Sequence, residues 1–198
     1  MKTFIAIAPA CICVLSIAGV SAHAQAQSQQ EAIKAIEEAE GSVREIAQND
    51  KRLEVDFHLA SDSLSNDTVA HVEKLGDVMR VHLGGTQITD AALGHLKGLS
   101  SLVALHLERT GITDAGLANL KGLKNLEYLN VYGTEVGDAG LAHLKGLTNL
   151  KKLYVWQTKA TEQGIAELKK ALPDLDVDTG WELKEPQTEK KETTKDSK

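Results

Sequence analysis

The chain has few cysteines and few aromatic residues, and both shortages limit its chemistry. Its two cysteines, Cys11 and Cys13, lie in a mostly apolar run from Phe4 to Val20. Without this run the chain has no thiol, which excludes disulfides and thiolate metal sites, and the haem-attachment sequence Cys-x-x-Cys-His is absent. Aromatic residues make up 4% of the 198 residues, so a place where they gather is informative.

A surplus of basic charge is also missing. The formal net charge is −6 at pH 7, so the chain has no electrostatic footprint for nucleic acid. It contains neither a nucleophile elbow nor a phosphate-binding glycine loop. We therefore expect a protein that is not an enzyme, that holds no cofactor and that has no nucleic-acid partner.

The start of the chain is typical of a secretory signal peptide. Lys2 precedes the apolar run, and Ala22-His23-Ala24 follows it as the small-x-small pattern of a cleavage site. We expect residues 1–24 to be removed by cleavage after Ala24, with Ala26 as the second choice. An uncleaved membrane anchor is the less favoured alternative, because Pro9 interrupts a run that is short for a span of ~20 residues. The mature protein is then secreted or periplasmic, in or near the cell envelope, and has no membrane span.

The rest of the sequence repeats itself every 24 residues. Residues 100–123 (SSLVALHLERTGITDAGLANLKGL) and 124–147 (KNLEYLNVYGTEVGDAGLAHLKGL) are consecutive copies, and the same spacing extends from about Glu54 to about Asp178. A fixed period of this length indicates a solenoid of stacked repeats, whose functional surface consists of rows of equivalent positions.

Each copy begins with a strand pattern. With Leu102 as position one, apolar residues fill positions one, four and six, which indicates a short strand with one buried face. We expect this pattern to start at Phe57 and Leu59, and Val177 fits position four only. The complete sets are Val78, Val81, Leu83; Leu102, Leu105, Leu107; Leu126, Leu129, Val131; and Leu150, Leu153, Val155.

A helix pattern follows each strand. Position eleven is one more inward apolar residue, and the next residue caps a helix whose first turn carries an acid or an amide. The expected caps are Ser65, Thr89, Thr113 and Thr161. Gly137 interrupts this row, so the helix after it is expected to fray. Leucines then recur three apart, as at Leu117 and Leu120, which predicts a helix of about two turns.

This pattern, L-x-x-L-x-L-x-x-T-x-I-T-D-x-G-L-x-x-L-x-x-L, resembles the leucine-rich repeat family, in particular its bacterial secreted members. The resemblance implies an α/β fold, a right-handed solenoid shaped as an arc or horseshoe, with a parallel concave sheet of about 5–6 strands and short convex helices. It also implies that the concave face binds a protein or peptide. One departure is a threonine where many members carry an inward asparagine, although its hydroxyl can still bond the neighbouring turn. These threonines are Thr86, Thr110, Thr134 and Thr158.

The repeat domain is expected to span residues 53–181 and to be closed at both ends, because open ends of a solenoid expose its core. Apolar residues at helical spacing between Ile33 and Ile46 predict an N-terminal capping helix within residues 25–52, which Gly41 can split. At the other end Leu168, Leu172, Leu175 and Trp181 are expected to close the core. Residues 182–198 have no apolar period, so we expect a disordered charged tail.

Aromatic residues gather on the expected concave face, at positions three, five and seven of two adjacent repeats. All three tyrosines and one of the two tryptophans lie there. Amphipathic aromatic side chains beside charged ones are typical of binding hot spots. The alternative is that aromatic pairs merely stabilise the sheet. The predicted partner-binding residues are Tyr128, Tyr132, Tyr154, Trp156, Lys152, Arg109, Glu108 and Asn130.

Histidines occupy position five of the three earlier repeats, as His58, His82 and His106. Adjacent strands lie ~4.8 Å apart, so two rings can approach one ion, but a third is too far for a Zn–N bond of ~2.0 Å. We therefore predict no metal site and interpret the row as solvated side chains. The alternative is a pH-sensitive ladder whose members repel one another when protonated.

The sequence thus predicts a non-catalytic interaction module that binds a protein or peptide of unknown identity through its concave face. Two alternatives from other classes stay open. One is a structural protein of the cell envelope that associates with itself, and the other is a carbohydrate-binding repeat protein, since aromatic faces also suit sugars.

Overall fold

The computed structural model describes residues 16–60 and 64–180. Most of the predicted signal peptide, Trp181 and the predicted tail lie outside this part of the chain. Within it, none of the helices combines the length and the apolar character that crossing a membrane requires.

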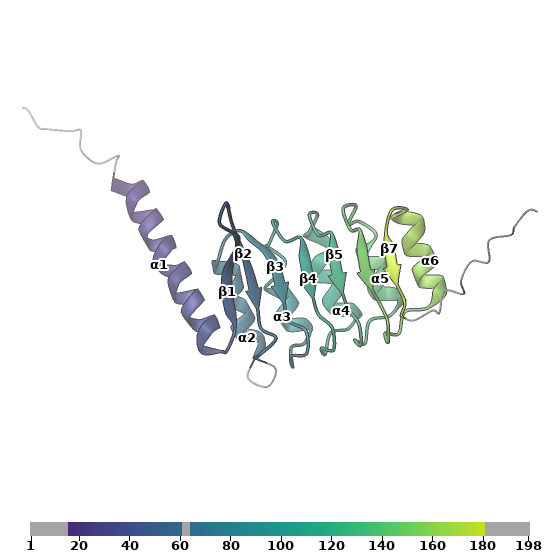
Figure 1. Ribbon diagram of the computed structural model, residues 1–198. Coiled ribbons are helices and arrows are strands. Elements are labelled where there is room, and N and C mark those ends of the chain that lie inside the picture. Colours follow the sequence, from purple (N-terminus) through teal and green to yellow (C-terminus); the bar gives the residue numbers. More distant parts are fainter. Residues whose placement is uncertain (1–15, 61–63, 181–198) are drawn as a thin grey trace, which may run out of the picture.

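One sheet of seven strands forms the first layer of the molecule, with the strands in chain order. β1 and β2 are antiparallel, and every later neighbour is parallel. In Figure 1 the strands follow one another along the length of the molecule, with the short helices on one side of the sheet. The strands are β1 (Ser42–Ala47), β2 (Asp50–Asp56), β3 (Val78–His82), β4 (Ala104–His106), β5 (Tyr128–Asn130), β6 (Lys152–Tyr154) and β7 (Asp176–Asp178).

The second layer consists of short helices, one or two per repeat. A longer helix, α1, stands at the N-terminal end of the sheet, and α6 lies at the opposite end (Figure 1). The helices are α1 (Ser16–Glu38), α2 (Asn66–Val69), η1 (Ala70–Lys74), α3 (Asp90–Gly94), α4 (Asp114–Leu117), η2 (Ala118–Gly122), α5 (Asp138–Leu144) and α6 (Glu162–Ala171).

The core lies between these layers, where the repeat pattern places it. The position-four residues Val81, Leu105, Leu129 and Leu153 are register partners on adjacent strands, and each is fully buried. The residues at positions one and six of the same repeats are also buried. Burial of an apolar side chain of this size stabilises a fold by roughly 1.5–3 kcal/mol, so the stacked rows are the main source of stability. The structure confirms the α/β leucine-rich repeat solenoid.

The inward threonines bond differently from the expectation. Each hydroxyl donates to the carbonyl three residues earlier in its own repeat, as Thr110 Oγ1 does to Leu107 O at 2.6 Å, and not to the neighbouring turn. A hydroxyl reaches only this local acceptor because it is shorter than an amide side chain. The bond gives the buried hydroxyl a partner and occupies a carbonyl at the end of each strand.

Neighbouring repeats are joined by the aspartate in the first turn of α3, α4 and α5. Asp90 accepts from both the backbone N–H and the hydroxyl of Thr113, at 2.8 and 2.6 Å, and Asp138 bonds Thr161 in the same way. Asp114 accepts from the N–H groups of Gly137 and Gly140, at 2.7 and 2.8 Å. The acid therefore caps the helix of the next repeat as well as starting its own.

These bonds bear on the prediction that the helix after Gly137 frays, because they supply an acceptor that Gly137 lacks. α5 begins at Asp138, the same place in the repeat at which α3 and α4 begin, although Gly137 makes no side-chain cap. Asp114 supplies the cap from the preceding repeat. A Cβ at Gly140 would lie 2.5 Å from Asp114 Oδ1, so the glycine of the T-D-x-G-L motif leaves room for this carboxylate.

The predicted N-terminal helix is wrong beyond residue 38. Residues 42–47 form β1, which pairs with β2, and a bulge between Glu45 and Ala47 lets Val43 and Ile46 both be half-buried although they are three apart. That spacing imitated a helix. Gly41 marks the change of structure, because a Cβ there would lie 2.6 Å from a ring carbon of Phe57.

The two ends of the described solenoid are covered. Ala32 and Ile36 of α1 are fully buried, and Gln29 donates to the backbone carbonyl of Leu75 at 2.9 Å. At the other end Leu168, Leu172 and Leu175 are at most 5% exposed. Exposed apolar ends, a hazard for solenoids, are thereby avoided within the described residues.

The first repeat is longer than predicted, and this changes its register. Val55 pairs with Val81 and Asp56 with His82, so equivalent positions are 26 residues apart there and not 24. The extra residues fall between Phe57 and Leu64. As a result Leu59 is 70% exposed, against the prediction that it lies in the core, while Phe57 is fully buried.

Candidate functional site

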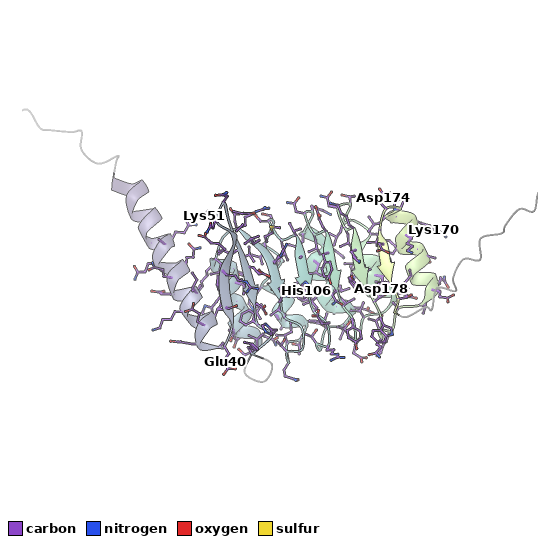
Figure 2. The ribbon with its side chains drawn as sticks, in the orientation of Figure 1. Glu40, Lys51, His106, Lys170, Asp174 and Asp178 are labelled. Atoms are coloured by element: carbon purple, nitrogen blue, oxygen red, sulfur yellow. The ribbon has the colours of Figure 1, made fainter. Side chains whose placement is uncertain are left out.

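The site lies on the open face of the sheet, defined as the face opposite the short helices. Two rows of side chains cross it. Row five holds the position-five residues Asp56, His82, His106, Asn130, Tyr154 and Asp178, which are register partners on successive strands. Row seven follows the strand ends with Gly84, Glu108, Tyr132, Trp156 and Gly180. Figure 2 labels His106 near the middle of this face and Asp178 at its C-terminal end.

Rings contact one another along the open face from β3 to β6. His82 and His106 are stacked with their centroids 3.9 Å apart, and His106 lies 4.7 Å from Tyr128. Tyr128 in turn lies 5.4 Å from Tyr154, in a tilted arrangement. Burial, together with the neighbouring Tyr154 and Glu108, raises the pKa of Tyr128 to about 12, so its hydroxyl is a donor at neutral pH.

The predicted ladder of three histidines contains only two. His58 lies beyond the end of β2, and its Nδ1 is 2.7 Å from Asp56 Oδ1, because the longer first repeat puts Asp56 at position five. Partial burial opposes ionisation of Asp56, but hydrogen bonds from the backbone N–H and ring of His58 outweigh it and lower its pKa. The carboxylate beside His82 belongs to Glu54, whose Oε1 lies 3.3 Å from His82 Nε2.

Glu108 lies folded back toward the end of β3, against Gly84. Gly84 gives it room, since a Cβ there would be 2.5 Å from Glu108 Oε1. Its Oε2 is buried and has no hydrogen-bond partner among the described residues, and His106 Nδ1 is 3.7 Å away. Burial opposes ionisation of Glu108, but its interactions with His106, its own backbone N–H and the nearby His82 together lower its pKa.

A second stack runs along row seven. The rings of Tyr132 and Trp156 are nearly parallel, with centroids 4.8 Å apart and 9° between their planes. The guanidinium of Arg109 lies 5.2 Å from the centre of Tyr132 and donates to its hydroxyl at 3.0 Å. On the far side of Trp156, a Cβ at Gly180 would overlap the indole ring, so the backbone lies directly against it.

An aromatic pocket of about 320 Å³ lies between rows five and seven at β5, β6 and β7. Its lining residues are Asn130, Tyr132, Tyr154, Trp156, Asp178 and Gly180. Asn130 Oδ1 accepts from the N–H of Tyr132 at 3.0 Å, and Asp178 Oδ1 accepts from the N–H of Gly180 at 2.9 Å. These bonds hold the two rows at a fixed distance and make the pocket a preformed feature.

The structure brings most of the predicted binding residues together. Asn130, Tyr132, Tyr154 and Trp156 line the pocket. Tyr128 contacts Tyr154, Lys152 Nζ lies 5.3 Å from the centre of the Tyr154 ring, and Arg109 flanks Tyr132. Glu108 lies instead against Gly84, as described above.

Two lining residues, Asp178 and Gly180, were missed by the sequence analysis. Extending the 24-residue spacing by one more repeat, from Tyr154 to Asp178 and from Trp156 to Gly180, would have found both. Val177 at position four was the signal, because it pairs with Leu153 and so continues the strand pattern.

No metal-binding arrangement accompanies the pocket within the described part of the chain. Among residues 16–60 and 64–180, no group of three or more histidine, cysteine or acidic side chains is placed to hold a metal ion. The pocket itself combines flat rings with one amide and one carboxylate. Such a surface suits recognition, since rings give contact area and the polar groups fix orientation.

Comparison with known proteins supports the fold. No protein-family model matches the chain, and no curated protein matches it. Among solved structures, the LRR ectodomain of the receptor kinase SOBIR1 from Arabidopsis thaliana is 17% identical, with a TM-score of 0.50, over 77% of this chain and 91% of that chain. An internalin (inlF) from Listeria monocytogenes is 24% identical over 57% of this chain, with a TM-score of 0.49, and the match spans 31% of the internalin.

Proposed function

We propose that this leucine-rich repeat solenoid is a secreted or periplasmic interaction module, without catalytic activity, that binds a protein or peptide through the aromatic pocket and its surroundings. One observation carries the proposal: Tyr132, Tyr154 and Trp156 converge on one preformed pocket in a chain that is poor in aromatic residues. Solenoids commonly use the extended face of their sheet for binding.

The exposure of Trp156 favours binding over a purely structural role. Its side chain is 39% exposed, whereas the core leucines are almost fully buried. A stacked aromatic pair stabilises a fold by about 0.5–1.5 kcal/mol beyond the effect of its buried area. This gain is small, so stacking alone does not explain a tryptophan that is partly exposed to water. Exposed aromatic residues next to a pocket are typical of hot spots, which bury their remaining surface against a partner.

The geometry favours a peptide over a carbohydrate. Stacking on a sugar needs a free aromatic face, but Tyr132 has Arg109 and Trp156 on its two sides, and Trp156 has Tyr132 and Gly180. The pocket therefore presents ring edges and polar groups. These suit a side chain inserted between the rows better than a sugar ring laid on one of them.

The test is affinity capture from native cell-envelope extract with the mature protein and with the Tyr132→Ala/Trp156→Ala variant. We expect a protein that the wild type retains and the variant loses. Equal retention by both, or no retention by either, would contradict the proposal and direct attention to self-association, which the mass in solution at several concentrations measures.

A matched control keeps the result specific. Lys121 and Lys145 occupy equivalent positions in the helical layer, away from the open face, and Lys121→Ala/Lys145→Ala removes the same number of side chains. This control variant should retain the partner as the wild type does. Circular dichroism of all three proteins establishes that each is folded.

A further inference from the structure

Charge is unevenly distributed around the aromatic pocket. Asp178 lines its C-terminal end, and Asp176 lies two residues earlier on the same strand, β7. Among the described residues, the basic group of Lys152 contacts this end, with its Nζ 4.0 Å from Asp176 Oδ2 and 5.3 Å from the centre of the Tyr154 ring. Two carboxylates and one ammonium group leave this end of the pocket negative, within a chain whose net charge is −6.

Asp178 has acceptor capacity that the described residues do not use. Its Oδ1 accepts one bond, from the N–H of Gly180, and no hydrogen bond or ion pair within residues 16–60 and 64–180 involves Oδ2. A carboxylate accepts up to about four hydrogen bonds. Because Oδ1 is fixed by the backbone, the second oxygen is held in place at the pocket wall.

The aromatic residues provide a matching apolar channel. Tyr154 lines the pocket from row five and Trp156 from row seven, and the indole of Trp156 is also packed against Tyr132 and Gly180. Lysine and arginine carry an apolar stem and a charged head, so one side chain can contact both kinds of surface. A volume of about 320 Å³ is sufficient for either.

We propose that the aromatic pocket binds a lysine or arginine side chain of an extended peptide segment in the partner, with the methylenes between Tyr154 and Trp156 and the cation on Asp178. This inference rests on the proposed function, because it states which peptide chemistry the same pocket takes. Arg109, at the opposite end of the Tyr132–Trp156 stack, repels a cation there and fixes the direction of the basic residue toward β7.

The test selects random linear peptides from a phage-displayed library against four immobilised proteins. These are the wild type, Asp178→Asn, Tyr132→Ala/Trp156→Ala, and the control Asp174→Asn, which removes the same charge from the exposed turn before β7 (Figure 2). Asparagine keeps an oxygen that can accept from Gly180, so Asp178→Asn changes the charge and little else.

The expected result is a set of peptides with one constant basic position, selected by the wild type and by Asp174→Asn. For one such peptide and its copy with glutamine at that position, Asp178→Asn should weaken binding of the basic form roughly tenfold and leave the glutamine form unchanged. This coupling shows that the basic residue and Asp178 act on each other.

The contradicting outcomes separate the two proposals. Peptides that depend on Tyr132 and Trp156 but have no constant basic position, or that bind Asp178→Asn equally well, would overturn this inference and leave the proposed function intact. Selection of no peptide whose binding depends on the aromatic pair would overturn both.

Discussion

Tyr132 and Trp156, 24 residues apart in the sequence, stack with their ring centroids 4.8 Å apart and their planes 9° from parallel. The spacing equals one repeat, so the two side chains lie at the same position on neighbouring turns of the solenoid. Gly180 continues the same row beyond Trp156, and Arg109, from position eight of the preceding repeat, lies over the Tyr132 ring. The stack is therefore a wall of the aromatic pocket whose position is set by four successive repeats.

Replacing Gly180 by alanine should displace Trp156 and close part of the pocket. A Cβ there would overlap the indole ring, and the φ angle of +101° adds backbone strain. We expect loss of partner binding together with a changed near-ultraviolet circular dichroism spectrum. Gly76→Ala is the matched control, because Gly76 has φ +89° but nothing within 4 Å of the added atom. Equal effects of both changes on binding would show that strain alone matters.

Replacing Asp114 by alanine should destabilise the solenoid by about 1–2 kcal/mol, the usual cost of removing a helix cap. The change leaves the N–H groups of Gly137 and Gly140 without their acceptor. Urea denaturation measures the free energy of unfolding. Glu162→Ala is the control, since Glu162 has the same place in the first turn of α6 but makes no such bond to a following repeat within the described residues. A similar loss for both variants would contradict the inter-repeat role.

The stability of the protein should decrease as the pH falls from about 7 to about 5, and His82 should cause much of this decrease. Burial and the neighbouring His106 lower the pKa of His82, and this outweighs the opposite effect of Asp56, Glu54 and Glu108. In the unfolded chain His82 is protonated as the pH falls below its ordinary pKa of about 6.5. In the folded chain His82 is protonated only at lower pH. Protonation therefore favours unfolding in this range.

The measurement is the thermal midpoint at several pH values for wild type, His82→Gln and His143→Gln. The slope between pH 7 and 5 should be smaller in His82→Gln and unchanged in His143→Gln, which alters a histidine on α5. A second decrease, near the ordinary carboxyl range of about pH 4, should persist in all three, because the lowered pKa values of Asp56 and Glu108 stabilise the folded state only while these groups are ionised. A wild-type slope in His82→Gln would refute this assignment.

Replacing Gln157 by glycine should stabilise the protein by about 1 kcal/mol, because left-handed backbone is costly for a residue with a side chain. Position eight of four successive repeats is left-handed, with Gly85, Arg109, Gly133 and Gln157 at φ angles of 75°, 54°, 67° and 53°. Gln87→Gly, at an exposed loop residue without positive φ, should instead be neutral or slightly destabilising. Calorimetric melting curves of both variants show whether Gln157→Gly raises the melting temperature while Gln87→Gly leaves it unchanged or lowers it.

Much of the fold follows from the sequence because equivalent residues pack in the same way in successive repeats. Leu105, Leu129 and Leu153 are buried in one row because the 24-residue spacing brings equivalent residues together, and the same reasoning places Tyr132 beside Trp156. The apolar pattern of one short strand is ambiguous, but several copies with the same spacing identify the strand positions. The middle repeats were therefore predicted correctly.

The errors lie where the repetition stops. Val43 and Ile46 imitate a helix because a bulge changes the strand period, and His58 leaves its row because two extra residues enter the first repeat. Asp178 was missed because only one apolar residue of its repeat signals the strand. Capping of Gly137 by Asp114 depends on a contact between repeats, which a pattern within one repeat does not contain.

The central claim, that the aromatic pocket binds a partner, is tested most directly by isothermal titration of the captured protein into wild type, Tyr132→Ala/Trp156→Ala and Lys121→Ala/Lys145→Ala. The account predicts at least about thirtyfold weaker binding for the aromatic variant, as expected for hot-spot residues, with a melting temperature within a few degrees of wild type. An unchanged dissociation constant, or a large fall in melting temperature without a change in affinity, would instead show that the stacked rings only stabilise the sheet.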